Sequence, residues 1–268
     1  MTTAYEALLG TDFDGSPTDD PYDVIYDGHD HPRHRDRVPG LVALVADPGG
    51  AAGERLMALV ALVSWAEPAG FEAVVRAAGD PRATPWYDWS IDRWFSADRS
   101  YGLFCEAAAG SRELAEEKGT TALRTETFRA LIGLADREGF DDRLGDVLDA
   151  EAVRACLPEI RAVIDRGIAR IRDGERFHFD VETQLVDLAG SVTRVDEELA
   201  VDLLGRLLAH APSGRALQHA AGPVARCQGP AGRALAARLW DSGNAYVREV
   251  LGGREPAGGD FRTDVPAG

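Results

Sequence analysis

Three consecutive stretches decide the fold class of this chain: VPGLVALVADP (38–48), GERLMALVALVSWAEP (53–68) and AGFEAVVRAAGDP (69–81). Each is an apolar run with the spacing of a helix, and an Asp-Pro pair ends the first and the third. Proline has no backbone N–H and disfavours a helical conformation in the residue before it, so it punctuates helices. A helix–turn–helix unit that recurs at this length is typical of a helical solenoid. The stretch therefore predicts an all-α fold arranged as an α-α superhelix.

The same periodicity places helices along most of the chain. We expect them at 33–46, 53–66, 68–78, 98–109, 120–137, 141–148, 150–172, 178–194, 196–210, 214–226 and 229–251. Thr120 and Asp196 are placed to cap two of these helices. In the helix after Asp196, one apolar stripe is predicted from helical spacing, formed by Leu199, Leu203, Leu204, Leu207 and Leu208.

Three segments interrupt or flank the predicted helical repeat domain, which spans 33–252. Residues 1–32 contain eight acids and no Lys or Arg, and their Gly, Pro and Asp turn signals predict an irregular acidic arm, poorly ordered over 1–20. Residues 79–97 form an aromatic insertion between helices. Residues 253–268 have the composition of a disordered tail.

Composition narrows the classes of partner and compartment. The chain has 268 residues, 45% of them hydrophobic, and a formal net charge of −16. Such a charge repels phosphate backbones and anionic lipids, so we expect a basic protein as partner and neither nucleic acid nor membrane. The sequence shows no signal peptide and no membrane-spanning run, which predicts a cytoplasmic protein. Cys105, Cys156 and Cys227 form no CxxC pair and are expected to be small buried hydrophobes.

Residues 38–81 resemble HEAT-like repeats. The resemblance lies in an apolar first helix, an Asp-bearing turn, Arg55 in the second helix and Ala- and Leu-rich packing after it. TALRTETFRALIGLAD (121–136) resembles another second helix, with Arg124 or Arg129 at the matching place, and 195–226 resembles a further helix pair. The resemblance implies an α-solenoid that binds other proteins. Short acidic helical proteins of this kind also resemble bacterial immunity proteins, which neutralise toxins.

The aromatic insertion supplies the candidate partner-binding residues. WYDWSIDRWF (86–95) gathers the side-chain types that carry most interface energy, and the candidates are Trp86, Tyr87, Asp88, Trp89, Asp92, Arg93 and Trp94. Buried rings that fill a gap between successive repeats are the competing interpretation.

A metal site is the second possibility. VIYDGHDHPRH (24–34) resembles the opening of amidohydrolase barrels, in which two histidines bind a divalent metal, and its candidates are His29, His31 and His34. The sequence offers no barrel strands, and its single lysine, Lys118, lies in an acidic helical stretch. An exposed polar turn explains the three histidines more simply. A metal-dependent hydrolase or small-molecule-binding protein that uses His29 and His31 is therefore the alternative function.

The acidic segment also matches the spacing of a calcium loop. Oxygen-bearing side chains occupy the ligand positions of DFDGSPTDDPYD (12–23): Asp12, Asp14, Ser16, Thr18, Asp20 and Asp23. Pro17 replaces the glycine that such a loop needs, and no amphipathic helix precedes it, so a solvated acidic segment is the better interpretation.

No GxGxxG, P-loop, GxSxG or HExxH motif occurs in the chain. The sequence thus favours a non-enzymatic protein-binding helical repeat protein that uses no cofactor.

Overall fold

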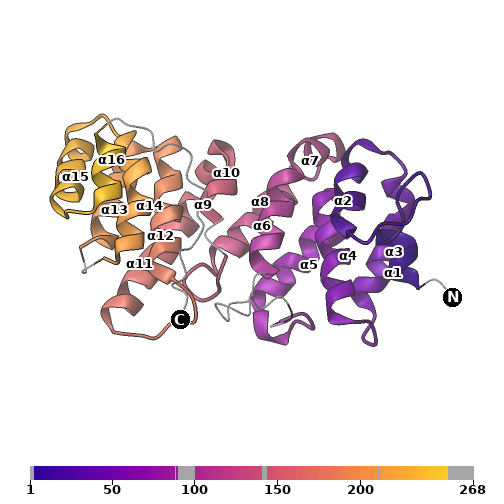
Figure 1. The fold of residues 1–268 in the computed structure, drawn as a ribbon. Coiled ribbons are helices and arrows are strands. Elements are labelled where there is room, and N and C mark those ends of the chain that lie inside the picture. The colour runs from indigo at the N-terminus through magenta and orange to yellow at the C-terminus, as the bar shows by residue number, and fades with distance from the viewer. Residues whose placement is uncertain (1–2, 88, 90–99, 141–143, 210–211, 253–268) are drawn as a thin grey trace, which may run out of the picture.

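The computed structural model describes residues 3–87, 89, 100–140, 144–209 and 212–252, and over these residues the fold is all-α (Figure 1). The described residues contain no strand, only an isolated antiparallel bridge between Thr11 and Pro17. Their α-helices are α1 (Ala4–Leu9), α2 (Pro21–Asp30), α3 (His34–Ala46), α4 (Ala52–Ser64), α5 (Pro68–Gly79), α6 (Ser100–Gly110), α7 (Arg112–Lys118), α8 (Thr121–Ile132), α9 (Leu144–Val147), α10 (Ala150–Ala155), α11 (Leu157–Arg172), α12 (Val181–Ser191), α13 (Glu197–Leu207), α14 (Gly214–Ala225), α15 (Pro230–Asp241) and α16 (Ala245–Leu251). Two 3-10 helices, η1 (Pro81–Ala83) and η2 (Val192–Arg194), complete the set.

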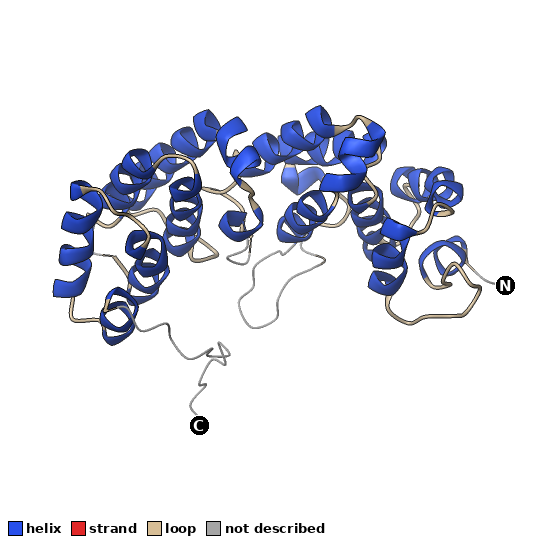
Figure 2. Ribbon diagram, turned by 90° about the horizontal axis from the view of Figure 1, so that it is seen from above, coloured by secondary structure: helices blue, strands red, loops and turns tan. Residues whose placement is uncertain are grey.

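The helices pack in two rows. In one row α2, α4, α6, α9, α12, α14 and α16 each contact the next, and in the other α5, α8, α11, α13 and α15 do the same. Contacts between α4 and α5, α11 and α12, and α14 and α15 join the rows. The helices follow a curved path from the N-terminal end to α15 and α16 (Figure 2).

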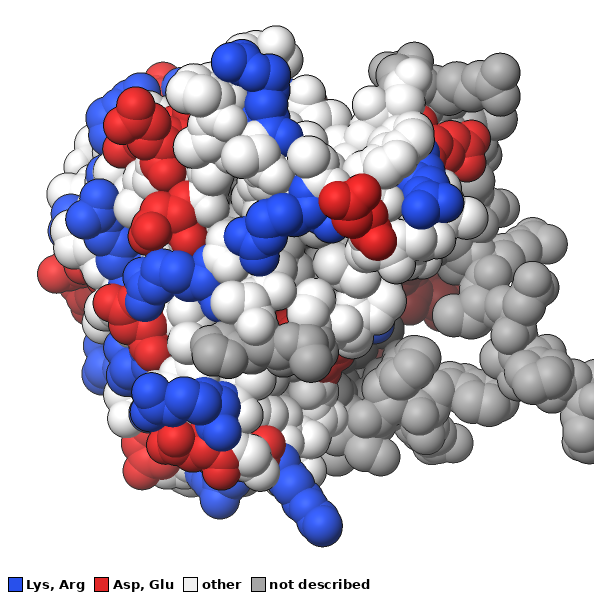
Figure 3. All heavy atoms as spheres, turned by 90° about the vertical axis from the view of Figure 1, so that its left-hand side faces the viewer, with Lys and Arg blue, Asp and Glu red and all other residues white. Residues whose placement is uncertain are grey.

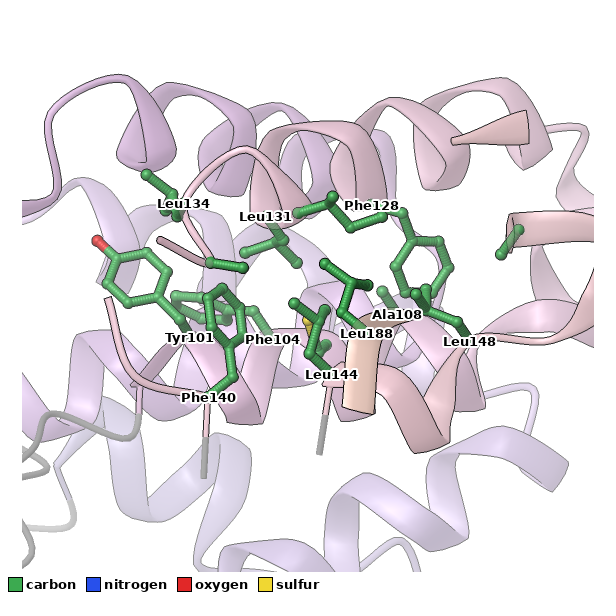
Figure 4. Packing of buried hydrophobic residues seen from close by; sticks show 14 of the residues in the cluster. Tyr101, Phe104, Ala108, Phe128, Leu131, Leu134, Phe140, Leu144, Leu148 and Leu188 are labelled. Atoms are coloured by element: carbon green, nitrogen blue, oxygen red, sulfur yellow. The ribbon is translucent and has the colours of Figure 1, made fainter. Parts of the chain in front are cut away.

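A continuous apolar core links the two ends of the molecule. At its middle, buried side chains from α6, α8, α9 and α12 meet (Figure 4). The rings of Tyr101 and Phe104 lie edge to face at 6.1 Å, and Phe140 lies 6.1 Å from Tyr101. Since all three rings are fully buried, this junction packs as interior.

Two buried polar side chains reinforce the junction. The carboxylate of Asp136 is 2% exposed and accepts hydrogen bonds from Arg166 at 2.9 and 3.2 Å. Gln184 on α12 donates to the carbonyls of Ala135 and Glu138. Because a buried polar group without a partner costs free energy, these bonds fix how α11 and α12 lie against the end of α8.

The predicted irregular arm over 1–32 is wrong where the structure describes it. Thr3 and Glu6 form a capping box that starts α1, and Asp20 caps α2, whose first residue is Pro21. Glu6 and Asp20, two acids of the predicted irregular arm, therefore take part in helix capping. Leu9, Phe13, Val24 and Ile25 are buried and belong to the main core.

Arg37 of α3 explains how the turn after α1 is held. Its guanidinium donates to the carbonyls of Leu8, Thr11 and Asp12 and lies 4.1 Å from the centre of the Phe13 ring. In contrast to the poor order predicted over 1–20, the structure describes residues 3–20 as α1 and a turn, and Arg37 satisfies three of their backbone carbonyls. The predicted tail, 253–268, lies outside the described residues.

Several helix boundaries differ from the predicted ones for local reasons. The helix predicted at 150–172 is two helices, because Pro158 at the start of α11 breaks the run at Cys156. The helix predicted at 229–251 is also two, since the chain turns at Gly243 with φ +79°. The predicted helix at 120–137 ends at Ile132, and α7 occupies a stretch where none was predicted.

Within the described residues, no helix combines the length and the apolar character that crossing a membrane would require.

Candidate protein-contact site

The structure separates the two described tryptophans of the aromatic insertion. Trp86 is 4% exposed and meets Phe104 edge to face at 6.1 Å, so it belongs to the core. Trp89 is 55% exposed, and Tyr87 is half-buried. Asp88, Asp92, Arg93 and Trp94 lie outside the described residues. Among the predicted contact residues that the structure describes, Trp89 is thus the exposed one.

Trp89 lies against the start of α4. A Cβ atom added to Gly53 would come within 2.2 Å of the Trp89 indole, so only a glycine leaves room for the ring there. The backbone N–H of Trp89 donates to the carbonyl of Trp86 at 2.9 Å. The buried Trp86 therefore helps to anchor the short turn that presents Trp89.

A groove of about 200 Å³ lies between α2, α4 and α6. Its walls include Tyr22, Ile25, Tyr26 and His29 of α2, Val60 and Ser64 of α4, and Leu103 and Glu106 of α6. Tyr26 is 67% exposed and stacks on Tyr22 with 6.0 Å between the ring centres. An aromatic side chain of this exposure, beside an apolar cavity, is characteristic of protein contact surfaces.

The groove and Trp89 border the same face of α4. Gly53, Met57, Val60 and Ser64 follow the helical spacing of four, three and four residues, so they form one stripe, the α4 stripe. From Gly53 to Ser64 this stripe is about 16 Å long at 1.5 Å per residue. All four residues of the stripe are buried, so it forms interior packing, with Trp89 near one end and the groove and Tyr26 near the other.

The groove has an acidic border. Asp23, Asp27 and Asp30 of α2 are exposed beside the groove-facing residues, and Glu106 lines the groove itself. Burial lowers the pKa of His29 below its ordinary value, while Asp30 and Glu113 act in the opposite direction. His29 is therefore mostly neutral near pH 7 and leaves the negative charge of the border in place.

The structure places the three candidate metal histidines in different surroundings. His29 lines the groove, and the ring of His31 stacks on Phe13 at 4.6 Å. His34 is buried and its Nδ1 lies 2.9 Å from the carbonyl oxygen of His31. Across the described ranges, no three His, Cys, Asp or Glu side chains are grouped to hold a metal ion. The described residues therefore bring no metal-ligand set together around His29 and His31.

His34 instead belongs to a polar network centred on Lys118. The ammonium group of Lys118 lies 2.8 Å from His34 Nε2 and donates to the carbonyl of Trp65 at 2.7 Å and to Glu67 at 2.6 Å. Burial and the Lys118 charge lower the pKa of His34. The network ties α3 and α7 to the turn between α4 and α5.

The acids of the predicted calcium loop serve local turns. Asp12 accepts from the N–H of Phe13, and Asp14 accepts from both the N–H and the hydroxyl of Ser16, bonds that lower the Asp14 pKa. Asp20 caps α2, and Asp23 accepts from the Thr18 hydroxyl. Their side chains thus stabilise the connection between α1 and α2.

The three cysteines are buried free thiols, as the sequence predicts. Burial raises the pKa of Cys105 and Cys227, and that of Cys156 to about 12. None is suited to nucleophilic chemistry, which requires a thiolate.

Tyr22 and Tyr26 are not among the contact residues predicted from the sequence, because both lie in the segment predicted to be an irregular arm. The spacing of Tyr22, Ile25, Tyr26 and His29 is that of one helix face and could have identified α2. Sequence reasoning also missed the contact between Asp187 and His219, which come from different helices. Comparison with protein-family models, with curated proteins and with solved structures finds no significant match to this chain.

Proposed function

We propose that this chain is a non-enzymatic protein-binding α-solenoid whose contact surface consists of the exposed rings of Tyr26 and Trp89 and the groove between α2, α4 and α6. The observation that carries the proposal is the position of two strongly exposed aromatic side chains, Tyr26 and Trp89, along one helix face. Exposed aromatic rings beside an apolar groove are common binding anchors.

Two equivalent arginines support the repeat architecture. Arg55 is the fourth residue of α4 and donates from Nε to the carbonyl of Val45, near the end of α3, at 3.1 Å. Arg124 is the fourth residue of α8 and donates in the same way to Ala108, near the end of α6, at 2.6 Å. Of the two candidates for the matching position, Arg124 rather than Arg129 makes this bond. Together with the two helix rows, the pairing favours HEAT-like repeats.

The surface has the chemistry to bind a basic amphipathic helix. Its groove is lined by apolar side chains that include Ile25, Val60 and Leu103, which suits an apolar anchor on one face of a partner helix. Its acidic border would attract Lys and Arg on the flanks of the partner and accelerate association at low salt. A basic toxin is one partner of this kind, and binding it would make the chain an immunity protein.

A comparison of variants tests the proposal. Proteins captured by the wild-type chain from its native host would be identified, and their affinities measured for Tyr26→Ala, Trp89→Ala and Trp240→Ala. Trp240 is a matched control, since it is 43% exposed but lies on α15, at the other end of the molecule.

If Tyr26 and Trp89 are binding anchors, each change should weaken the interaction by about 2 kcal/mol, roughly thirtyfold, while Trp240→Ala leaves it unchanged. Circular dichroism would verify that all three variants fold. Equal affinity of the folded Tyr26→Ala and Trp89→Ala variants for every captured protein would remove this surface from the proposal.

A further inference from the structure

A second cavity lies far along the chain from the protein-contact surface. It has a volume of about 260 Å³, and its walls come from α9, η2, α12, α14 and α16. The polar side chains around it include Asp146, Asp187, Arg194, Gln218, His219 and Arg226. Polar groups that converge on a cavity are typical of sites for small molecules, and a cavity of this size suits a small one.

Close helix packing builds the walls of this cavity. A Cβ atom on Gly145 would lie 2.4 Å from the carbonyl oxygen of Asp187, and one on Gly190 would lie 2.7 Å from the Pro223 ring. The backbones of α9, α12 and α14 can approach this closely only because glycine occupies both positions. The cavity is therefore bounded by packed helices rather than by mobile side chains alone.

An oriented imidazole forms part of the wall. His219 Nδ1 lies 2.8 Å from Asp187 Oδ1, and the two side chains are 23% and 14% exposed. A carboxylate that holds one ring nitrogen fixes the orientation of a histidine, an arrangement that recurs where the ring must meet a ligand.

Two guanidinium groups flank the same cavity. Arg194 donates to the carbonyls of Gly145 and Leu148, which fixes its position at the edge. Arg226 lies beside Gly222, with Nη1 3.8 Å from where a Cβ of that glycine would be. Among the residues that the structure describes, neither arginine forms an ion pair, whereas Arg124, Arg166 and Arg206 do.

We propose that this cavity binds a small molecule through an oxyanion, a carboxylate or a phosphate, that Arg194 and Arg226 recognise. Guanidinium groups match the geometry of both oxyanions and form strong charge-assisted hydrogen bonds with them. Asp146 and Asp187 line the same cavity and repel polyanions, which restricts the ligand to a compact molecule of low charge. The site is separate from the proposed protein contact and does not depend on it.

Glycine amide signals in nuclear magnetic resonance spectra provide local reporters. Inorganic phosphate and acetate would be titrated separately into the full-length protein at constant ionic strength, because salt alone screens surface charge. We expect at least one probe to cause saturable shifts at Gly145, Gly190 and Gly222, with Gly28 and Gly53 unchanged. A response to phosphate alone would indicate a phosphate ester, and a response to acetate alone a carboxylate.

Arg226→Gln is the decisive variant, because its guanidinium makes no hydrogen bond that the helices require among the described residues. It should weaken the responding probe about tenfold, the loss expected for one charge-assisted hydrogen bond. Arg215→Gln, on the same helix but paired with Asp180, is the control and should bind as the wild type does. The proposal is overturned if neither probe gives saturable shifts at the three glycines, or if Arg226→Gln binds as tightly as Arg215→Gln.

Discussion

The two ends of this molecule pack helices in the same way but differ in core composition and surface charge. Near the N-terminus the fully buried side chains include the rings of Trp65 and Phe71, whereas the buried hydrophobic residues described beyond residue 180 are aliphatic apart from one cysteine. Residues 1–32 carry eight acids and no Lys or Arg, while basic and acidic side chains are interspersed at the end formed by α15 and α16 (Figure 3). Similar helix packing therefore occurs beneath a surface with excess negative charge at one end and beneath a surface of mixed charge at the other.

The largest expected effect concerns the acidic N-terminal segment. Deleting residues 1–20 removes α1 and exposes the apolar surface that Leu9 and Phe13 cover, and it leaves Arg37 without its carbonyl partners. We expect the free energy of unfolding to fall by roughly 3–6 kcal/mol, the value for burial of two such side chains. Chemical denaturation followed by circular dichroism measures it. An unchanged midpoint would show that the segment is peripheral after all.

The same substitution can be made at each end of the molecule. Trp65 is fully buried and donates from Nε1 to the carbonyl of Ile25 at 2.9 Å, so Trp65→Ala should cost about 3–5 kcal/mol. Trp240 is 43% exposed, so Trp240→Ala should cost less than about 1 kcal/mol. Both values come from urea unfolding curves. Similar losses in the two variants would contradict the burial that distinguishes the two ends.

The smallest expected effect is a pH dependence of stability that originates at the N-terminal end. The pKa of His34 is lowered in the folded state, so below about pH 6.5 the unfolded state binds more protons and stability falls as the solution is acidified. The melting temperature should therefore decrease from pH 7.5 to pH 5.5.

His34→Gln is the matched variant for this dependence. It should lose less stability than the wild type over the same pH interval, although His29, whose pKa is also lowered, still contributes in the same direction. Identical slopes in the wild type and in His34→Gln would assign the dependence to other groups.

Local patterns in the sequence were sufficient for much of the fold. Asp196 caps α13 as predicted, because a cap depends on residues within one helical turn. Of the predicted stripe, Leu203, Leu204, Leu207 and Leu208 are buried and Leu199 is half-buried. Thr120 does not cap α8 with its side chain. Its hydroxyl donates to the carbonyl of Ala66, more than fifty positions earlier.

The candidate site was less accessible to sequence reasoning for the same physical reason. Trp89 was identified from its residue type, but its place beside Gly53 depends on contact between distant segments. The aspartates around Tyr26 are typical of an irregular segment, so the sequence does not predict the helix that carries it. Two of them nevertheless stabilise that helix and the turn before it, since Asp20 caps α2 and Asp23 accepts from the Thr18 hydroxyl. Charge along a sequence does not reveal which acids are held by the backbone.

The environment of Lys118 has a practical consequence for covalent labelling. Lys118 is the single lysine in the chain, and its ammonium group makes three contacts in a largely buried network. Reagents that acylate lysine side chains therefore have one slow target while the protein is folded, and they leave the arginines and the surface charge they carry intact. The rate of acylation at Lys118 would therefore report local unfolding of the N-terminal helices.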